Sequence, residues 1–310
     1  MKALVATGTP GSLVAFADVP EPTPTASEAV VQIEAFSVNR GEYFGLSGAY
    51  GTPAEAGFRP GKDVAGRVLR AAADGSGPAV GQRIVAFLEE GGWAERVGVA
   101  AASLAVLPDN VTATQAATLP LAGLTALRLV RAGGEIEGRR ILLTGASGGV
   151  GHYLVELALA AGAEITALTG SVPRGRGLAE RGAHVVQQLA DATGSFDVVM
   201  ESIGGDTFPA ALAKLAPGGT LLWFGQASEK PVTLSFFDLF RNTPLTIKHF
   251  AHWISDVPDS EDLTTLVRLV STGQITAEIG RTADWGDTAN TLEDLYHRTI
   301  RGNAVLTLTD

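Results

Sequence analysis

The sequence contains no cysteine among its 310 residues. Disulfide bonds, thiolate nucleophiles and thiolate-ligated zinc or iron–sulfur centres are therefore excluded, and folding does not depend on an oxidising compartment. Positive charge is also scarce, because 23 lysines and arginines stand against 33 aspartates and glutamates, for a formal net charge of −10. Such a chain lacks the generic basic surface that binds nucleic acid, so we expect no nucleic-acid partner.

Long apolar runs and clustered metal ligands are missing as well. The most apolar helical stretch, residues 154–163, contains Glu156 and is shorter than the roughly 20 residues that cross a bilayer. The N-terminal MKALVATG reaches glycine before a signal-peptide core accumulates. Of the five histidines, His249 and His252 lie closest together but have no third ligand nearby. We expect a cytoplasmic protein with no membrane partner and no metal site.

The sequence shows two different patterns of apolar residues along its length. Residues 1–112 hold short apolar runs separated by glycine and proline, which predicts an antiparallel or barrel-like β domain. From 113 to 255, strand-like and helical runs alternate, which predicts an α/β domain with a doubly wound parallel sheet. We expect its first helical stretch to be split in two at Pro120. Residues 256–310 end in a helix and a strand that could complete either domain.

A glycine-rich turn opens the second domain's alternating pattern. The apolar strand 141–144 is followed by Gly145, Gly148, Gly149 and Gly151, and then by a helix. Glycines at such a junction let the chain turn tightly and let a diphosphate approach the N–H groups at the positive end of the helix. A tight turn without a ligand is the alternative, and the strand–turn–helix–strand setting disfavours it.

The segment after the next strand indicates which dinucleotide the turn would bind. An acidic residue about 20 residues past the glycines binds a ribose 2′-hydroxyl, whereas arginine accommodates a 2′-phosphate. Here the expected loop carries Ser171, Arg174 and Arg176, with no carboxylate before Glu180. This composition favours NADPH over NADH, and a solvated basic loop is the alternative.

Several separated motifs occur in order over nearly the whole chain. They are FSVNR at 36–40, PGKDVAG at 60–66, LPDN at 107–110, ATLPLAGLTA at 117–126, the glycine turn, FDVV at 196–199 with Gly204-Gly205, and APGG at 216–219. As a set they resemble the medium-chain dehydrogenase/reductase superfamily, specifically its zinc-independent quinone oxidoreductase branch, which includes zeta-crystallin-like proteins.

The resemblance implies a GroES-like catalytic domain (1–112, completed by 256–310) and a Rossmann NADPH-binding domain (113–255). It further implies a substrate cleft where they meet, and a homodimer often built by joining Rossmann sheets edge to edge. Zinc-dependent relatives carry Gly-His-Glu where this chain has Gly61-Lys62-Asp63, so no zinc is expected.

Three positions depart from the family pattern. Glu42 replaces the usual aspartate, Phe44 replaces a common tyrosine, and Gly302-Asn303 replaces a glycine–lysine pair. These changes affect the expected substrate chemistry and one phosphate or ribose contact, but not the expected fold.

The expected activity is hydride transfer from NADPH to a small-molecule quinone or α,β-unsaturated carbonyl. Reduced nicotinamide supplies the chemistry, and the protein aligns it with an electrophilic carbon and stabilises the developing oxyanion. Two alternatives stay open. One is an enoyl-thioester reductase of the polyketide or fatty-acid type, and the other is a redox-silent NADPH-binding protein, which Phe44 keeps possible.

We expect Asn39 and Tyr50 to be catalytic, as polar donors near the substrate oxygen or the nicotinamide. Structural alternatives are that Asn39 caps a turn, that Tyr50 is an ordinary loop aromatic, and that Thr125 bonds its own helix backbone. Arg40 and Glu42 could form a local ion pair, and Asp63 is expected to bond backbone in a tight connection. The expected cofactor-binding residues are Asn39, Thr125, Ser147, Gly148, Gly149, Val150, Ser171, Arg174, Arg176, Phe224, Gly225, Phe250 and Asn303.

Overall fold

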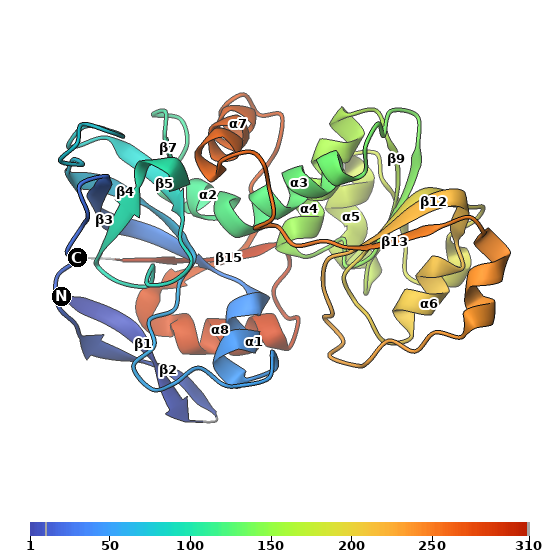
Figure 1. Cartoon of the computed structure of the whole chain (residues 1–310), viewed down its shortest axis with the longest axis horizontal. Helices are drawn as coiled ribbons and strands as arrows, with labels where there is room; N and C mark the ends of the chain where they lie inside the picture. The colour runs from blue at the N-terminus through green and yellow to red at the C-terminus, as the bar shows by residue number, and fades with distance from the viewer. Residues whose placement is uncertain (10, 309–310) are drawn as a thin grey trace. The chain divides into compact units, whose positions relative to one another are not determined.

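The computed structural model describes residues 1–9 and 11–308. It divides into two compact units, Met1–Leu124 with Asp256–Asp310, and Thr125–Ser255 (Figure 1). Residues 309 and 310, which end the expected C-terminal segment, lie outside the described residues. One unit is built on an antiparallel-rich sheet and the other on a parallel sheet, which confirms the predicted α/β fold class.

The first unit contains a seven-stranded sheet in the order β14-β15-β3-β4-β5-β7, with β6 paired to β3, and a separate β1–β2 pair. Apolar side chains around Phe36 and Trp93, whose rings stack 5.7 Å apart, form its core. The strands are β1 (Lys2–Thr9), β2 (Ser12–Asp18), β3 (Glu28–Val38), β4 (Asp63–Arg70), β5 (Arg83–Phe87), β6 (Arg96–Ala100), β7 (Leu104–Val106), β14 (Ile279–Asp284) and β15 (Asn303–Thr307).

One helical segment of this unit was expected in the other domain. Helix α2 packs against β3, β4 and β5, and the N-terminal stretch of the first unit runs to Leu124, past the expected boundary at residue 112. The segments are α1 (Arg40–Ser47), η1 (Ala101–Ser103), α2 (Ala113–Ala117), η2 (Leu119–Gly123), α7 (Asp259–Ser271), η5 (Trp285–Asp287) and α8 (Thr288–Tyr296).

Pro120 separates two α-helices, as predicted. It lies in η2, a π-helical turn between α2 and α3 (Leu124–Ala132). The wide turn accommodates the proline because the next N–H, that of Leu121, donates to Asp63 Oδ1 at 2.9 Å.

The second unit contains a parallel six-stranded sheet in the order β10-β9-β8-β11-β12-β13. The strands are β8 (Arg140–Leu143), β9 (Glu164–Leu168), β10 (His184–Val186), β11 (Phe196–Glu201), β12 (Leu215–Trp223) and β13 (Thr246–His249), and the further helical segments are α4 (Gly149–Ala160), α5 (Val172–Glu180), η3 (Leu189–Asp191), α6 (Thr207–Leu212) and η4 (Phe236–Asn242). Strand order reverses between β8 and β11. Ligands of doubly wound sheets bind at the carboxyl ends of the strands at such a switch point.

The two arginines lie on a helix, α5, rather than on the predicted loop. Pro173 stands in its first turn, where a fixed φ favours a helix and a missing N–H costs nothing. Gly175, which lies between the two arginines, is buried where any Cβ would overlap Val185 of β10. The glycine therefore serves close packing of the helix on the sheet, not chain flexibility.

Candidate functional site

The glycine turn between β8 and α4 has the geometry of a dinucleotide-binding turn. Gly145 has φ +64°, and an ideal Cβ there would lie 2.6 Å from Ser202 Oγ, so this position requires glycine. At Gly151 a Cβ would overlap Ala146 O, which shows close packing of the helix on the turn. A Cβ at Gly148, the N-cap, meets nothing nearer than 3.5 Å. These are the roles of tight turn, close packing and open approach that the chemistry requires.

The start of α4 presents backbone N–H groups beside this turn. Helical bonding begins with the bond from His152 N to Gly148 O (3.1 Å), and Gly148, Gly149 and Val150 are partly exposed. The N–H groups of the first turn have no intrahelical acceptor, and the helix dipole adds positive potential there. This end of α4 is suited to an anion.

Arg174 reaches this turn from α5. Its Nε donates to Ser147 Oγ at 3.0 Å, and its side chain is partly buried, whereas Arg176 is exposed. Ser171 is the N-cap of α5, and its carbonyl accepts from Thr169 Oγ1 at 3.1 Å. The structure thus brings together Ser147 and Arg174 but leaves Arg176 outside this contact.

The other cofactor-binding residues predicted in this unit lie on neighbouring segments. Phe224 and Gly225 follow β12, and Phe250, which follows β13, donates its N–H to Trp223 O at 2.8 Å. A Cβ at Gly225 would lie 3.1 Å from Ser202 O, so this segment and the glycine turn both abut residue 202. Thr125 is buried near the start of α3.

In the first unit, Asn39 is the N-cap of α1, the structural alternative considered for it. Its backbone N–H donates to Glu42 Oε2 at 2.7 Å, as in a capping box. Its Nδ2 donates to Asp63 Oδ2 at 2.7 Å and to Ser37 Oγ at 3.3 Å. The Nδ2 group is thus held by Asp63 and Ser37, which fixes the orientation of the Asn39 side chain.

Asp63 joins three of the sequence motifs. The carboxylate is fully buried and accepts hydrogen bonds from Ser37, from Asn39 and from the backbone of Leu121. This agrees with the structural role expected for it. Glu42 accepts from the N–H groups of Asn39 and Lys62, at 2.7 and 3.0 Å, and so bonds backbone rather than Arg40.

The two buried acids of this cluster have raised pKa values. Burial, followed by the negative charge of Asp63, raises the pKa of Glu42 from 4.5 to about 8. Burial likewise raises the pKa of Asp63 to about 6, against the opposing effect of its hydrogen bonds from Ser37 and Asn39. The cluster therefore titrates in the neutral range.

Two further predicted site residues of the first unit, Tyr50 and Asn303, differ in how far their side chains are exposed to solvent. Tyr50 is 71% exposed, and its ring packs edge-on against Phe44, with centroids 5.6 Å apart. Asn303 is buried in β15, where Nδ2 donates to Glu278 O at 3.1 Å. Its side chain is thus already bonded within the first unit.

Glu201 and Ser202, which end and follow β11 beside the glycine turn, are two residues of this region that were not expected in the site. The available signal was an acidic residue closing the apolar run FDVVM, where a buried strand reaches the ligand-binding edge. A buried carboxylate at that position requires donors, and the turns beside it supply them.

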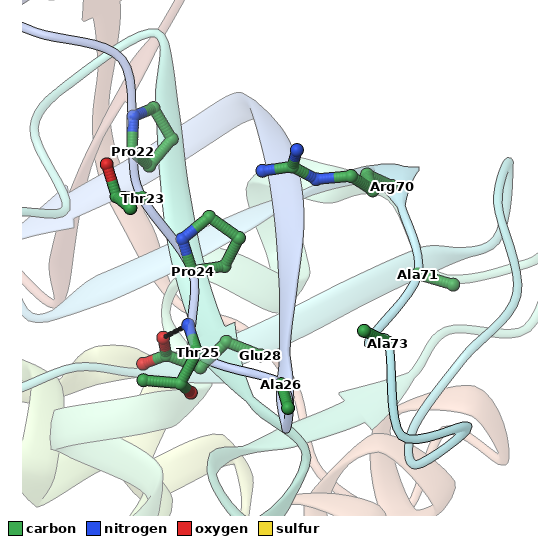
Figure 2. Close-up of a pocket in the computed structure, with 9 residues that line it drawn as sticks. All are labelled: Pro22, Thr23, Pro24, Thr25, Ala26, Glu28, Arg70, Ala71 and Ala73. Atoms are coloured by element: carbon green, nitrogen blue, oxygen red, sulfur yellow. Dashed lines mark hydrogen bonds between the residues drawn. The ribbon is translucent and has the colours of Figure 1, made fainter.

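A surface groove of about 510 Å³ lies elsewhere in the first unit (Figure 2). It is lined by residues 22–26, Glu28, Arg70 and two alanines, and Thr25 N donates to Glu28 Oε2 at 2.7 Å. None of the predicted site residues lines it.

Within the described ranges, no group of three or more potential ligands is placed to hold a metal ion. No helix of the described chain is long and apolar enough to span a membrane.

Comparisons with known proteins agree with this geometry. Residues 149–272 match the zinc-binding dehydrogenase family. A chloroplast envelope quinone oxidoreductase homolog of Arabidopsis thaliana is 30% identical over 315 residues, covering 92% of this chain and 90% of the relative. A mycobacterial protein solved with NADPH superposes with a TM-score of 0.88 at 26% identity, over 99% of this chain and 100% of that one. Escherichia coli quinone oxidoreductase, solved with NADPH, has the same fold, with a TM-score of 0.88 at 22% identity and the same coverage. The chain therefore belongs, as its motifs predicted, to the quinone oxidoreductases of the medium-chain dehydrogenase/reductase superfamily.

Proposed function

We propose that the protein is an NADPH-dependent oxidoreductase that transfers hydride to a quinone or an α,β-unsaturated carbonyl without zinc. The observation that carries this proposal is the glycine turn at the open N-terminus of α4, with Arg174 bonded to Ser147 beside it. Two structural relatives were solved with NADPH, which supports the same cofactor here.

The residues present fit this dinucleotide. The first turn of α4, preceded by Gly148, would hold the diphosphate, and Arg174 with Ser171 would hold the 2′-phosphate. Phe224 and Gly225 would flank the nicotinamide side, where the absence of a Cβ at residue 225 allows close approach. When bound, the reduced nicotinamide supplies the hydride.

The chain's own contribution is to orient the two reactants and to stabilise negative charge on the substrate oxygen. Tyr50 carries an exposed ring braced by Phe44, and we assign its hydroxyl as the donor to that oxygen. Asn39, whose Nδ2 already donates to Asp63, orients the ligand in this scheme rather than protonating it.

The zinc-free character of the proposal follows from the residues. The chain has no cysteine, and Lys62 stands where zinc-dependent relatives have histidine. A lysine ammonium is a donor of hydrogen bonds and not a ligand, so the position cannot serve that coordination.

We also propose a homodimer, formed at the β13 edge of the parallel sheet. Strand β13 ends the sheet order and its side chains are exposed. On η4, which packs on β12, the rings of Phe236, Phe237 and Phe240 cluster while 60 to 75% exposed. A second copy would cover both the open edge and this aromatic cluster. The cytoplasmic location stays a prediction.

The test is to mix the purified protein with NADPH and a panel of quinones, enones and crotonyl thioesters, and to follow the absorbance of the reduced nicotinamide. We expect oxidation with quinones or enones. Turnover of crotonyl thioesters alone would replace the proposal by the enoyl-thioester reductase alternative. NADPH binding without turnover of any acceptor would instead indicate a redox-silent protein.

A further inference from the structure

Glu201 ends β11 at the switch point of the parallel sheet. Its side chain is fully buried, and β11 is paired with β8, the strand across which sheet order reverses. The carboxylate thus lies beneath the edge where a doubly wound sheet binds its ligand. The mechanism proposed above leaves this group without a role.

The carboxylate of Glu201 is held by donors from two segments. Thr144 Oγ1, at the end of β8, donates to Oε1 at 3.1 Å. The N–H of Ile203 donates to Oε1 at 2.8 Å, and that of Gly204 lies 3.1 and 3.0 Å from the two oxygens. One side chain therefore ties the strand before the glycine turn to the segment after β11.

These partners follow the two strands of the switch point, β8 and β11. Thr144 immediately precedes Gly145, and its Oγ1 accepts from Ser202 N at 2.9 Å, while Ser202 Oγ donates to Thr144 O at 3.2 Å. Residue 202 is the one that both Gly145 and Gly225 approach so closely that a Cβ would crowd it. A shift at Glu201 would therefore move the glycine turn and the segment at Gly225 relative to each other.

A buried carboxylate is a costly way to join two strands. Burial raises the pKa of Glu201, and the donors from Ile203, Gly204 and Thr144 oppose that rise. At the amino ends of the same strands a cheaper link exists, because the partly exposed Asp197 accepts from Arg140 N at 2.9 Å. Strand pairing alone thus gives no reason to bury an acid at the carboxyl end.

We propose that Glu201 is a positioning residue for the dinucleotide: through Thr144 and the N–H groups of 203 and 204, it sets the spacing of the crevice that receives the diphosphate and nicotinamide. This inference rests on the proposed cofactor. Arg174, which belongs to α5, lies outside the hydrogen bonds of Glu201, and its proposed partner is the 2′-phosphate at the adenosine end.

The experiment compares two ligands on the full-length Glu201→Gln variant by calorimetry. The first is NADPH, and the second is adenosine 2′-monophosphate, which lacks the diphosphate and the nicotinamide half. Losing a charged acceptor for these bonds is expected to weaken NADPH about tenfold or more. Binding of the monophosphate is expected to change by less than about twofold, since its contacts at α5 are intact.

Asp197→Asn is the matched control, because it removes the charge from the acceptor that links the same two strands at their opposite ends. It should leave both affinities unchanged even where it lowers the melting temperature. Equal loss of both ligands in Glu201→Gln, or equal effects of the two variants on NADPH, would overturn the inference and leave a purely structural role.

Thr144→Val provides a second variant in case Glu201→Gln does not fold. It removes the hydroxyl between Glu201 and Ser202 with little change of shape, and it should weaken NADPH in the same selective way. An unchanged NADPH affinity in this variant would contradict the inference. Because the readout is binding, a wild-type protein that binds NADPH without turnover would contradict the proposed reaction and still allow this test.

Discussion

At the scale of single residues, neighbours on one helix differ in what they can bind. Arg174 and Arg176 were equivalent in the sequence, because both follow the strand where a 2′-phosphate is expected. The structure separates them, since Arg174 is partly buried and bonded to Ser147, whereas Arg176 is exposed. A guanidinium held in place loses less entropy on binding a phosphate than one free in solvent.

We expect Arg174→Ala to weaken NADPH roughly tenfold to 100-fold, the range for a lost charge-assisted bond, and to leave NADH nearly unchanged. Arg176→Ala is the matched control from the same helix and should have a smaller effect. Fluorescence titration with both coenzymes measures this. An equal loss for NADPH and NADH would remove the 2′-phosphate assignment.

The raised pKa of Glu42 predicts how the free energy of unfolding depends on pH. Its pKa is about 8 in the folded protein and 4.5 for the ordinary group, so between these values the folded state holds more protons than the unfolded state. The free energy of unfolding therefore falls as pH rises through this window, by at most about 1.4 kcal/mol per pH unit. Asp63 acts in the same direction below pH 6.

In Glu42→Gln the fall between pH 6 and pH 8 should flatten, although the overall stability is lower because one backbone N–H loses its acceptor. Urea denaturation at several pH values measures the slope. Glu180→Gln, at an exposed position, should keep the wild-type slope. A wild-type slope in Glu42→Gln would show that this carboxyl is ionised throughout.

At the scale of elements, the sequence predicted the strands and the glycine turn well but not the helix that carries the arginines. The turn was predictable because glycine spacing and apolar periodicity are local signals. Helix α5 was not, because Gly175 and Gly177 have low helix propensity and the packing of Gly175 on Val185 depends on tertiary structure. The cluster of Glu42 and Asp63 was likewise hidden, since its members are joined only across β3, β4 and η2.

Two glycines on helices should respond oppositely to alanine. Gly151→Ala would overlap Ala146 O, so we expect it to destabilise the protein by about 1–3 kcal/mol and to weaken NADPH by displacing the turn. Gly177→Ala on α5 meets only the flexible end of Arg181, at 3.4 Å, and should stabilise by about 0.5–1 kcal/mol. Thermal denaturation distinguishes them, and a neutral Gly151→Ala would contradict the close-packing role of that glycine.

At the scale of the whole molecule, we expect the aromatic cluster on η4 to determine whether two copies of the chain form a dimer. Fully burying a phenylalanine contributes about 1.5–3 kcal/mol, so the double variant Phe237→Ser, Phe240→Ser should raise the dimer dissociation constant at least about tenfold. Light scattering on a sizing column measures this over a range of concentrations. Val80→Ser, at a site 64% exposed in the other unit, is the control. An unchanged mass would exclude this face as the interface.

The discontinuity of the first unit has a consequence for synthesis. Residues Thr125–Ser255 form one uninterrupted segment, whereas the seven-stranded sheet needs β15 beside β3, strands from opposite ends of the chain. As the polypeptide leaves the ribosome, the parallel unit has all of its strands well before the other sheet has its last two. Until then β3 has β4 on one side and β6 along residues 28–32 of the other, so its residues 35–38 stay unpaired on that side until β15 is translated.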